Sequence, residues 1–403
     1  MKALRNLLDK QAHLFHKGGP LERLHPVWEA QDTILYTPGI VTRAGAHVRD
    51  AIDQKRMMIV VVIGLLPAMA MAMYNTGLQA LSAISRGATP LDDLQMAAWA
   101  AMGLANDPGN LLSCLIFGAL YFVPVYAVTL AAGGAAEVVF AIVRRHPVTE
   151  GFLVTSALFP LILPATIPLW QVALGIMFGV VLGKEVFGGV GMNIFNPALV
   201  GRAFLFFAYP AQISGDQVWI AAATKGVDGL SGATALARAA ESGQPGFSLL
   251  DAFLGFVPGS MGETSALAIL LGAVVLIVTQ VGSWRTMVGV SLGTIAMASL
   301  LNLLGSDSNP MFALPFWWHM VLGGWALGAV FMATDPVSSA FSATGKLFYG
   351  AGIGILVVLI RVVNPAYPEG MMLAILFMNM FAPLIDHFVV KANIRRRVAR
   401  RVA

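Results

Sequence analysis

The sequence predicts an all-α integral membrane protein with about ten transmembrane helices. Hydrophobic residues make up 57% of its 403 residues and charged residues only 11%, with a mean hydropathy of +0.76. This balance excludes a soluble globular domain. Apolar runs long enough to cross a hydrocarbon core recur along the chain. The basic residues fall almost entirely on one side of the resulting topology, as expected for a multi-pass protein.

Residues 1–56 precede the first apolar run. They carry nine basic side chains and no run long enough to span a bilayer. We expect a cytoplasmic amphipathic segment lying at the membrane interface. The chain does not open on a basic segment followed by a short apolar run and a small-residue cleavage site, so no cleaved signal peptide is expected.

The first membrane half, residues 57–213, is expected to hold five spans. They are residues 57–76, 111–142, 151–166, 170–187 and 196–213. At 1.5 Å per residue the second run exceeds a core of about 30 Å, so it is expected to tilt or project. The third contains Pro160 and Pro164, which neighbouring helices can accommodate in a membrane.

A polar segment of 50 residues, 214–263, separates this half from the second, residues 264–390. The second half holds runs at 264–282, 285–304, 317–334, 346–363 and 370–390, and a basic tail follows at 391–403. Asn-Pro-Ala occurs at 196–198 and again at 364–366. Two five-span halves would be inverted relative to each other, as in many transporters. Chance recurrence of a common tripeptide is an equal alternative.

Orientation follows from the basic residues. With both termini in the cytoplasm, 21 Lys and Arg residues fall on the inner side and 4 on the outer side. Basic residues gather in cytoplasmic loops. The polar segment 214–263 is therefore expected outside the cytoplasm.

Within that segment, Asp228-Gly-Leu-Ser231-Gly232-Ala233-Thr234 resembles the signal at which a flavin is joined through its phosphate to a threonine hydroxyl. An acidic residue comes first, small residues leave the backbone accessible, and the last hydroxyl, on Thr234, would form the phosphoester. Gly, Ser, Asp and Thr also form ordinary loops, so a plain solvent turn is the alternative.

Ionisable residues at the ends of spans are costly and are therefore candidate functional residues. They comprise Glu137, the pair Lys184 and Glu185, Arg202, Asp335, Asp386 and His387, all expected near cytoplasmic ends. The alternative for Lys184 and Glu185 is a neutralised pair at the interface. Arg202 could simply anchor a helix end. Gly133 and Gly134 open space beside Glu137 for a flat ligand or for close helix packing.

Asn193 and Asn196 lie in polar, glycine-rich sequence between two spans, and residues 334–338 form a similar break. Such backbone is tolerated at membrane depth where it lines a cavity. The two amides could bind an isoalloxazine edge, or they could cap the next helix. Dinucleotide and P-loop motifs are absent from the sequence, and the single cysteine, Cys114, excludes a multi-cysteine cluster within the chain. Electrons would have to arrive from another subunit through an organic cofactor, and no metal site is expected.

The chain resembles the family formed by the B subunits of bacterial sodium-translocating NADH:quinone oxidoreductases and, less closely, the D subunits of Rnf electron-transfer complexes. The likeness covers nearly the whole chain. Its motifs are Tyr36–Gly39, His47–Asp50, Lys184–Gly189, Asn196–Ala198, Gly201–Pro210, Ser231–Thr234, Met332–Ser338 and Arg361–Gly370.

The resemblance implies a ten-span subunit of a six-subunit complex in the bacterial inner membrane. The complex would oxidise NADH at another subunit, reduce ubiquinone and export Na⁺. Partners would include a neighbouring FMN subunit, a flavin transferase and membrane lipid, and no nucleic acid.

By position, the resemblance implies covalent FMN on Thr234, with Asp228, Ser231, Gly232 and Ala233 as its recognition sequence. It implies non-covalent riboflavin near Asn193 and Asn196. It places the quinone region at Gly133, Gly134, Glu137 and Glu29, and the sodium path at Glu29, Glu137, Asp335 and Asp386. Bulkier aromatic residues are expected around positions 133 to 137 in some relatives, which affects the pocket shape expected here.

These implications together predict electron transfer from FMN through riboflavin to ubiquinone, coupled to Na⁺ translocation. Two alternatives stay open. An Rnf-type subunit would keep the flavin and change the electron donor. A flavin-free channel or secondary transporter is suggested by the two Asn-Pro-Ala tripeptides, which resemble those of aquaporins, although the chain is longer and the second tripeptide lacks the usual arginine after it.

Overall fold

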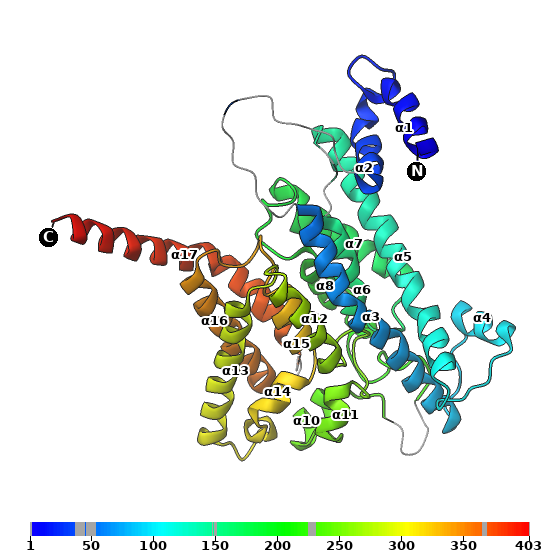
Figure 1. Ribbon diagram of the computed structural model, residues 1–403. Helices are drawn as coiled ribbons and strands as arrows, with labels where there is room; N and C mark the ends of the chain where they lie inside the picture. Colours follow the sequence, from blue (N-terminus) through cyan, green and yellow to red (C-terminus); the bar gives the residue numbers. More distant parts are fainter. Residues whose placement is uncertain are drawn as a thin grey trace.

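The computed structural model describes residues 2–36, 45, 54–146, 148, 151–224, 231–364 and 369–402, and its regular elements are helices (Figure 1). The only β pairing among these residues is an isolated antiparallel bridge between Thr89 and Ala223. The all-α prediction is confirmed.

Six helices in the described part of the chain are long and apolar enough to cross a membrane. They are α3 (Gln54–Ser85), α5 (Leu111–Arg144), α7 (Leu169–Gly183) with its 3-10 extension η2 (Glu185–Phe187), α13 (Trp284–Leu304), α16 (Ala343–Val363) and α17 (Met371–Val402). Three shorter apolar helices accompany them: α6 (Gly151–Leu161), α8 (Pro197–Ala208) and α12 (Ala266–Val278). The chain is therefore an integral membrane protein.

The remaining predicted span, 317–334, is broken. It consists of α14 (Phe316–Val321), α15 (Trp325–Leu327) and the π-helical turn η4 (Gly328–Met332). Arg361 of α16 satisfies carbonyl groups freed at the break, because its guanidinium donates to the carbonyl oxygens of His319 at 2.5 Å and of Leu322 at 2.9 Å. Irregular backbone inside a membrane bundle requires such internal partners.

Shorter elements connect the spans. They are α1 (Lys2–Phe15), η1 (Glu22–Leu24) and α2 (His25–Leu35) before the bundle, then α4 (Leu94–Met102), α9 (Pro210–Ile213), α10 (Ala235–Ser242), α11 (Leu249–Leu254) and η3 (Pro310–Ala313). Several helices begin at side-chain caps that the sequence makes visible. Asn110, Ser265, Ser283 and Ser342 each accept a hydrogen bond from a first-turn backbone N–H.

Some helix contacts recur in the two predicted halves. In the first half α5 packs on α7, α7 on α8, and α3 on α6. In the second half α13 packs on α16, α16 on α17, and α12 on α15 and η4. The packing of α3 on α5 has no counterpart of similar extent between α12 and α13 in the described part of the chain, so the repeat of five spans stays a prediction.

Close backbone contacts hold helices together. Gly64 of α3 lies against Gly272 of α12, where a Cβ on Gly272 would meet the Gly64 carbonyl, and this contact joins the two halves. Gly289 and Gly293 of α13 meet the backbone of α16 in the same way. Small residues permit this approach, and van der Waals packing drives helix association where lipid replaces water.

The ends of the bundle differ. In Figure 1, α1 and α2 lie at one end of the bundle, while α10 and α11 lie at the opposite end. Helix α17 does not stop at residue 390 but runs on through the predicted basic tail to Val402, and its last turns project from the bundle (Figure 1).

Candidate functional site

Thr234 is the N-cap of α10. Its backbone is extended, and its Oγ1 accepts a hydrogen bond from the backbone N–H of Ala237 at 3.2 Å. The predicted recognition residues lie directly before it, and the backbone N–H of Ala233 donates to Ser231 Oγ at 3.2 Å. Gly232 packs so closely on Asp216 that a Cβ would collide with the Asp216 carbonyl. Asp228 lies outside the described residues.

Two cavities meet at Thr234, which is half-buried between them. The first lies toward the bundle and is lined by Val257, Ser260 and Glu263. The second lies under the loop after α8 and is lined by Phe206, Trp219 and carboxylates including Asp216 and Glu241. The Thr234 hydroxyl is thus accessible to a group that occupies either space.

The residue types around Thr234 fit a flavin phosphoester. The helix N-terminus at α10 favours an anion through its backbone N–H groups and dipole. Phe206 and Trp219 supply the aromatic surface that a flat ring system packs against. Arg238, one turn into the helix, donates to the Ser231 carbonyl oxygen at 3.1 Å and lies over the Phe247 ring. Asp216 and Glu241 would repel a phosphate, so the ring rather than the phosphate suits the second cavity.

A buried charge network borders the first cavity. Arg202 of α8 is 4% exposed, forms an ion pair with Glu263 at 3.6 Å and contacts the Glu369 carboxylate. Glu369 also binds Arg361, whose Nε donates to its backbone carbonyl oxygen at 3.0 Å. The network ties the first half to the second beside Thr234.

The prediction that Arg202 lies near the cytoplasmic end of its span is wrong. Its guanidinium pairs with Glu263, at the end of the polar segment, and with Glu369, in the loop before α17. A basic residue six positions inside a short helix faces whichever carboxylates the opposite half presents, and sequence position alone does not reveal them.

Replacing Arg202 with methionine is expected to destabilise the protein strongly. The substitution leaves the buried Glu263 carboxylate and the part-buried Glu369 carboxylate without their shared partner, and breaking a buried ion pair typically costs about 3–5 kcal/mol. Thermal inactivation of the purified protein in detergent measures the effect. The Glu263→Gln variant is the matched control and should lose less, because Arg202 keeps Glu369. Equal stability of the Arg202→Met variant and the wild type would contradict this account.

Glu263 should make stability depend on pH. Burial raises its pKa from the usual 4.5 to about 7, although Arg202 acts in the opposite direction. Between these pH values the folded protein holds a proton that the unfolded chain releases, so the free energy of unfolding falls as pH rises through this window and then levels off. The apparent melting temperature should fall less between about pH 5 and about pH 8 in Glu263→Gln than in the wild type. If the melting temperatures of the two proteins fell equally with pH, the raised pKa of Glu263 would be contradicted.

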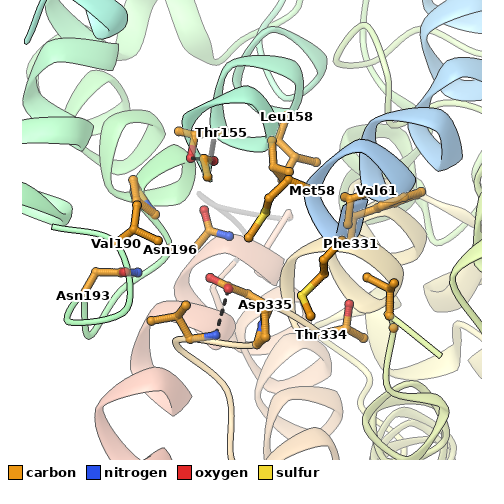
Figure 2. Close-up of a pocket in the computed structure, with 18 of the residues that line it drawn as sticks. Met58, Val61, Thr155, Leu158, Val190, Asn193, Asn196, Phe331, Thr334 and Asp335 are labelled. Carbon is orange, nitrogen blue, oxygen red and sulfur yellow. Dashed lines mark hydrogen bonds between the residues drawn. The ribbon is translucent and has the colours of Figure 1, made fainter. Parts of the chain in front are cut away.

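A third cavity lies at the end of the bundle opposite Thr234, and Figure 2 shows the residues that line it. Its apolar walls come from α3, α6 and η4 and include Met58, Leu158 and Phe331. Its polar groups come from three separate segments. They are Thr155, Lys184, Asn193, Asn196, Thr334 and Asp335. Figure 2 shows the Asn196 amide and the Asp335 carboxylate turned into the same space.

The two asparagines also organise their own loop. Asn196 caps α8, since its Oδ1 accepts from the backbone N–H groups of Ala198 and Leu199 at 3.0 and 3.4 Å. Asn193 donates through Nδ2 to the Phe195 carbonyl oxygen at 2.9 Å. The capping alternative is therefore confirmed for Asn196. The Asn196 Nδ2 and the Asn193 Oδ1 supply a donor and an acceptor that these bonds do not use, a donor set that fits a flavin edge.

Asp335 follows the π-helical turn η4, just after the end of the eighth predicted span. Its carboxylate accepts from the Val337 backbone N–H at 3.0 Å and from Ser338 Oγ at 2.8 Å. The bonds fix the carboxylate at the cavity while a neighbouring segment brings in the asparagines. Sequence motifs placed both groups near span ends, but only the fold brings them together.

Glu137 lies beside this cavity in a cluster that the sequence did not reveal. The ammonium of Lys184 contacts the Glu137 carboxylate and lies 3.7 Å from Glu185 Oε1, with all three side chains at least 95% buried. Arg144 donates to the Glu185 backbone oxygen at 2.5 Å. Lys184 and Glu185 do form a neutralised pair, but both side chains are buried in the protein, and Glu137 is the nearer partner of Lys184.

The two glycines before Glu137 differ in how closely neighbouring side chains pack against them. A Cβ on Gly133 would collide with the Phe152 ring and with Ile176, so this glycine permits close helix packing. At Gly134 a Cβ would meet only the Phe152 ring edge at an ordinary contact distance. Gly134 is therefore less tightly packed than Gly133.

Two predicted residues lie apart from the cavity lining. Asp386 of α17 accepts from the Phe341 and Ser342 backbone N–H groups at 2.6 and 3.0 Å and from Ser342 Oγ at 2.5 Å, so it braces the start of α16. Glu29 of α2 is part-exposed, and its carboxylate lies 3.7 Å from His25 Nδ1. In the described ranges no group of three or more His, Cys, Asp or Glu side chains could hold a metal ion.

The sequence matches a protein family and individual known proteins over most of its length. Residues 41–395 match the family model described as NQR2, RnfD, RnfE family. The chain is 60% identical over 404 residues to the B subunit of the Na(+)-translocating NADH-quinone reductase of Pseudomonas paraeruginosa, covering 98% of this chain and 99% of that protein. The B subunit of the same reductase from Chromohalobacter salexigens is 58% identical, with 99% and 97% covered, and that from Azotobacter vinelandii is 58% identical, with 99% and 100% covered. The chain belongs to the NQR2, RnfD, RnfE family.

Proposed function

We propose that the chain is a flavin-carrying membrane subunit of a redox-driven sodium pump that transfers electrons from NADH, oxidised on another subunit, to ubiquinone. Identity of 58–60% over full length to the B subunits of Na(+)-translocating NADH-quinone reductases carries the proposal. The chain would thus be one subunit of a translocase, assembled with an FMN-bearing neighbour and an NADH-oxidising subunit.

The Thr234 hydroxyl would hold FMN through a phosphoester, and the amides of Asn193 and Asn196 would hold riboflavin without a covalent bond. Flavins supply one- and two-electron chemistry, which connects a hydride donor to a quinone. The chain contributes a hydroxyl at a helix N-terminus, an aromatic wall, and two amides fixed by their own loop. These side chains bind and orient, and the surrounding apolar side chains exclude water.

Quinone would bind in the region of Gly134 and Glu137 on α5, with Gly133 permitting close helix packing and Glu29 lying on α2, which contacts α5. Na⁺ is a hard cation that prefers oxygen ligands. Asp335 offers a fixed carboxylate at the cavity, and Glu137 offers a carboxylate that Lys184 neutralises. A cation entering this end of the bundle would compete with the Lys184 ammonium for Glu137.

We place the N- and C-termini in the cytoplasm of a bacterial inner membrane and the Thr234 loop in the periplasm. The excess of basic residues at the ends of the chain supports this orientation. The position of α10 and α11 at the end of the bundle opposite α1 and α2 also supports it (Figure 1). Residues 57–213 and 264–390 would form the two membrane halves, with 1–56, 214–263 and 391–403 outside them.

The names of the similar proteins favour this function over an Rnf-type subunit. A flavin-free channel would need neither an accessible threonine at a helix N-terminus nor aromatic walls beside it. An assay of the purified complex tests the proposal. NADH-driven reduction of ubiquinone should accelerate with added Na⁺, and vesicles should accumulate Na⁺. NADH-driven turnover without Na⁺ stimulation or Na⁺ transport would contradict the proposed pump.

We also include Asp386 in the proposed ion path, although it lies apart from the cavity lining, so Asp386→Asn is expected to weaken the Na⁺ dependence of turnover. Because Asp386 also braces Ser342, Ser342→Ala serves as the matched control for the lost hydrogen bond. A several-fold higher half-saturating Na⁺ concentration is expected for Asp386→Asn and a smaller change for Ser342→Ala. Identical Na⁺ titrations for Asp386→Asn and wild type would remove Asp386 from the ion path.

A further inference from the structure

A groove opens between α16 and α17 where α17 leaves the bundle. Its apolar part is formed by Phe348 of α16 and by Ile385, Phe388 and Val389 of α17. Asn393 and Arg396 form its polar end. Phe348 is 64% exposed and Phe388 is 61% exposed, so large aromatic side chains face outward here.

The groove changes character along α17. Residues 385, 388, 389 and 392 follow helical spacing and share one face, and 393 and 396 continue that face into the projecting part of the helix. Because residues 371–385 pack within the bundle and the last turns project from it (Figure 1), the apolar part lies nearer the membrane interior. The groove is thus apolar toward the bilayer core and basic toward water.

Charge in the projecting segment has one sign. Residues 388–402 contain Lys391, Arg395, Arg396, Arg397, Arg400 and Arg401 and no acidic residue. The nearest carboxylate, Asp386, is hydrogen-bonded to Phe341 and Ser342 at the start of α16. Anionic lipid surfaces attract such clusters, and guanidinium groups bind phosphate oxygens through charge-assisted hydrogen bonds.

We propose that this groove binds one anionic phospholipid. Arg396 and Asn393 would hold the phosphate, and Phe348, Ile385 and Phe388 would receive an acyl chain. A free anion would bind the guanidinium but leave the apolar part of the groove exposed to solvent. A lipid without net charge would leave the positive charge at the polar end of the groove without a counter-charge. Only a molecule with both parts matches the full length of the groove. The site is independent of the flavin and ion roles proposed above.

Native mass spectrometry of the purified complex tests this site. The complex is incubated in neutral detergent with equal amounts of phosphatidylglycerol and phosphatidylcholine of the same acyl chains, and retained lipids are counted. The wild type should retain phosphatidylglycerol preferentially. Arg396→Gln should weaken retention of phosphatidylglycerol about tenfold, since a charge-assisted contact of this size is lost. Retention of phosphatidylcholine should change less, because its choline cation already compensates the charge of its phosphate. Ala392→Phe, which fills the groove, should reduce retention of both lipids.

Two variants serve as matched controls. Lys391→Gln removes a charge from the same helix outside the groove lining, and Val390→Phe places the same new side chain on another face. Both should retain phosphatidylglycerol as the wild type does. Equal loss in Lys391→Gln and Arg396→Gln would show diffuse attraction instead of a site and would overturn the proposal. Equal retention of the two lipids by the wild type would also overturn the proposal. The same holds if the Arg396→Gln complex loses another subunit and keeps its lipid.

Discussion

Replacing Thr234 with alanine is expected to remove the covalent flavin completely and to reduce NADH-driven quinone reduction to background. The substitution deletes the only atom that can form the proposed phosphoester, the hydroxyl that caps α10 between two cavities. The lost cap itself costs only about 1 kcal/mol, so the protein should still fold. Flavin fluorescence of the denatured subunit on a gel reports attachment directly.

Two further variants distinguish a loss of flavin attachment from a loss of folding. Thr234→Ser keeps an oxygen at the cap and should keep at least part of the fluorescence. Ser242→Ala removes a hydroxyl at the other end of α10, which donates to the Arg238 carbonyl oxygen, and should retain the band. If the alanine variant fluoresced as strongly as the wild type, the flavin would be attached elsewhere and the proposed anchor would be wrong.

Lys184→Met should be the most destabilising substitution at the other end of the bundle. It leaves the carboxylates of Glu137 and Glu185 buried without the ammonium, and unpaired buried charge typically costs about 3–5 kcal/mol. The yield of folded complex and its thermal inactivation should both show the loss of stability. Any surviving complex should show altered Na⁺ dependence, because Glu137 would no longer be neutralised by the chain itself.

The double variant Lys184→Met with Glu137→Gln provides the control. Removing the second charge should restore most of the lost stability, since replacing both members of a buried pair is often nearly neutral. A double variant as unstable as the single one would mean that Lys184 acts through packing of its stem and not through Glu137.

Local signals in the sequence predicted most of the fold. The apolar runs located all ten segments, and serine and asparagine caps set helix starts such as those of α5 and α16. The helical continuation of α17 through residues 391–402 was missed, because a basic segment without apolar runs gives no membrane signal although Arg and Lys favour helix.

The sequence predicted the short segments that contain the candidate sites, but it did not predict which residues of distant segments contact each other. Thr234 stands out because its neighbours form a compact motif. The pairing of Arg202 with Glu263 and Glu369, and that of Glu137 with Lys184, joins residues tens to more than a hundred positions apart. Such pairs depend on how the two halves face each other. The break at residues 322–324 was also hidden, because its hydrogen-bond partner is Arg361, on a different helix.

Mass measurement of the tryptic peptide that ends at Arg238, taken from the wild-type protein purified from its native host, tests the central claim most directly. The account predicts a peptide heavier than its amino acids by one FMN minus water, with fragmentation placing the addition on Thr234. A peptide of unmodified mass would contradict the proposed flavin attachment.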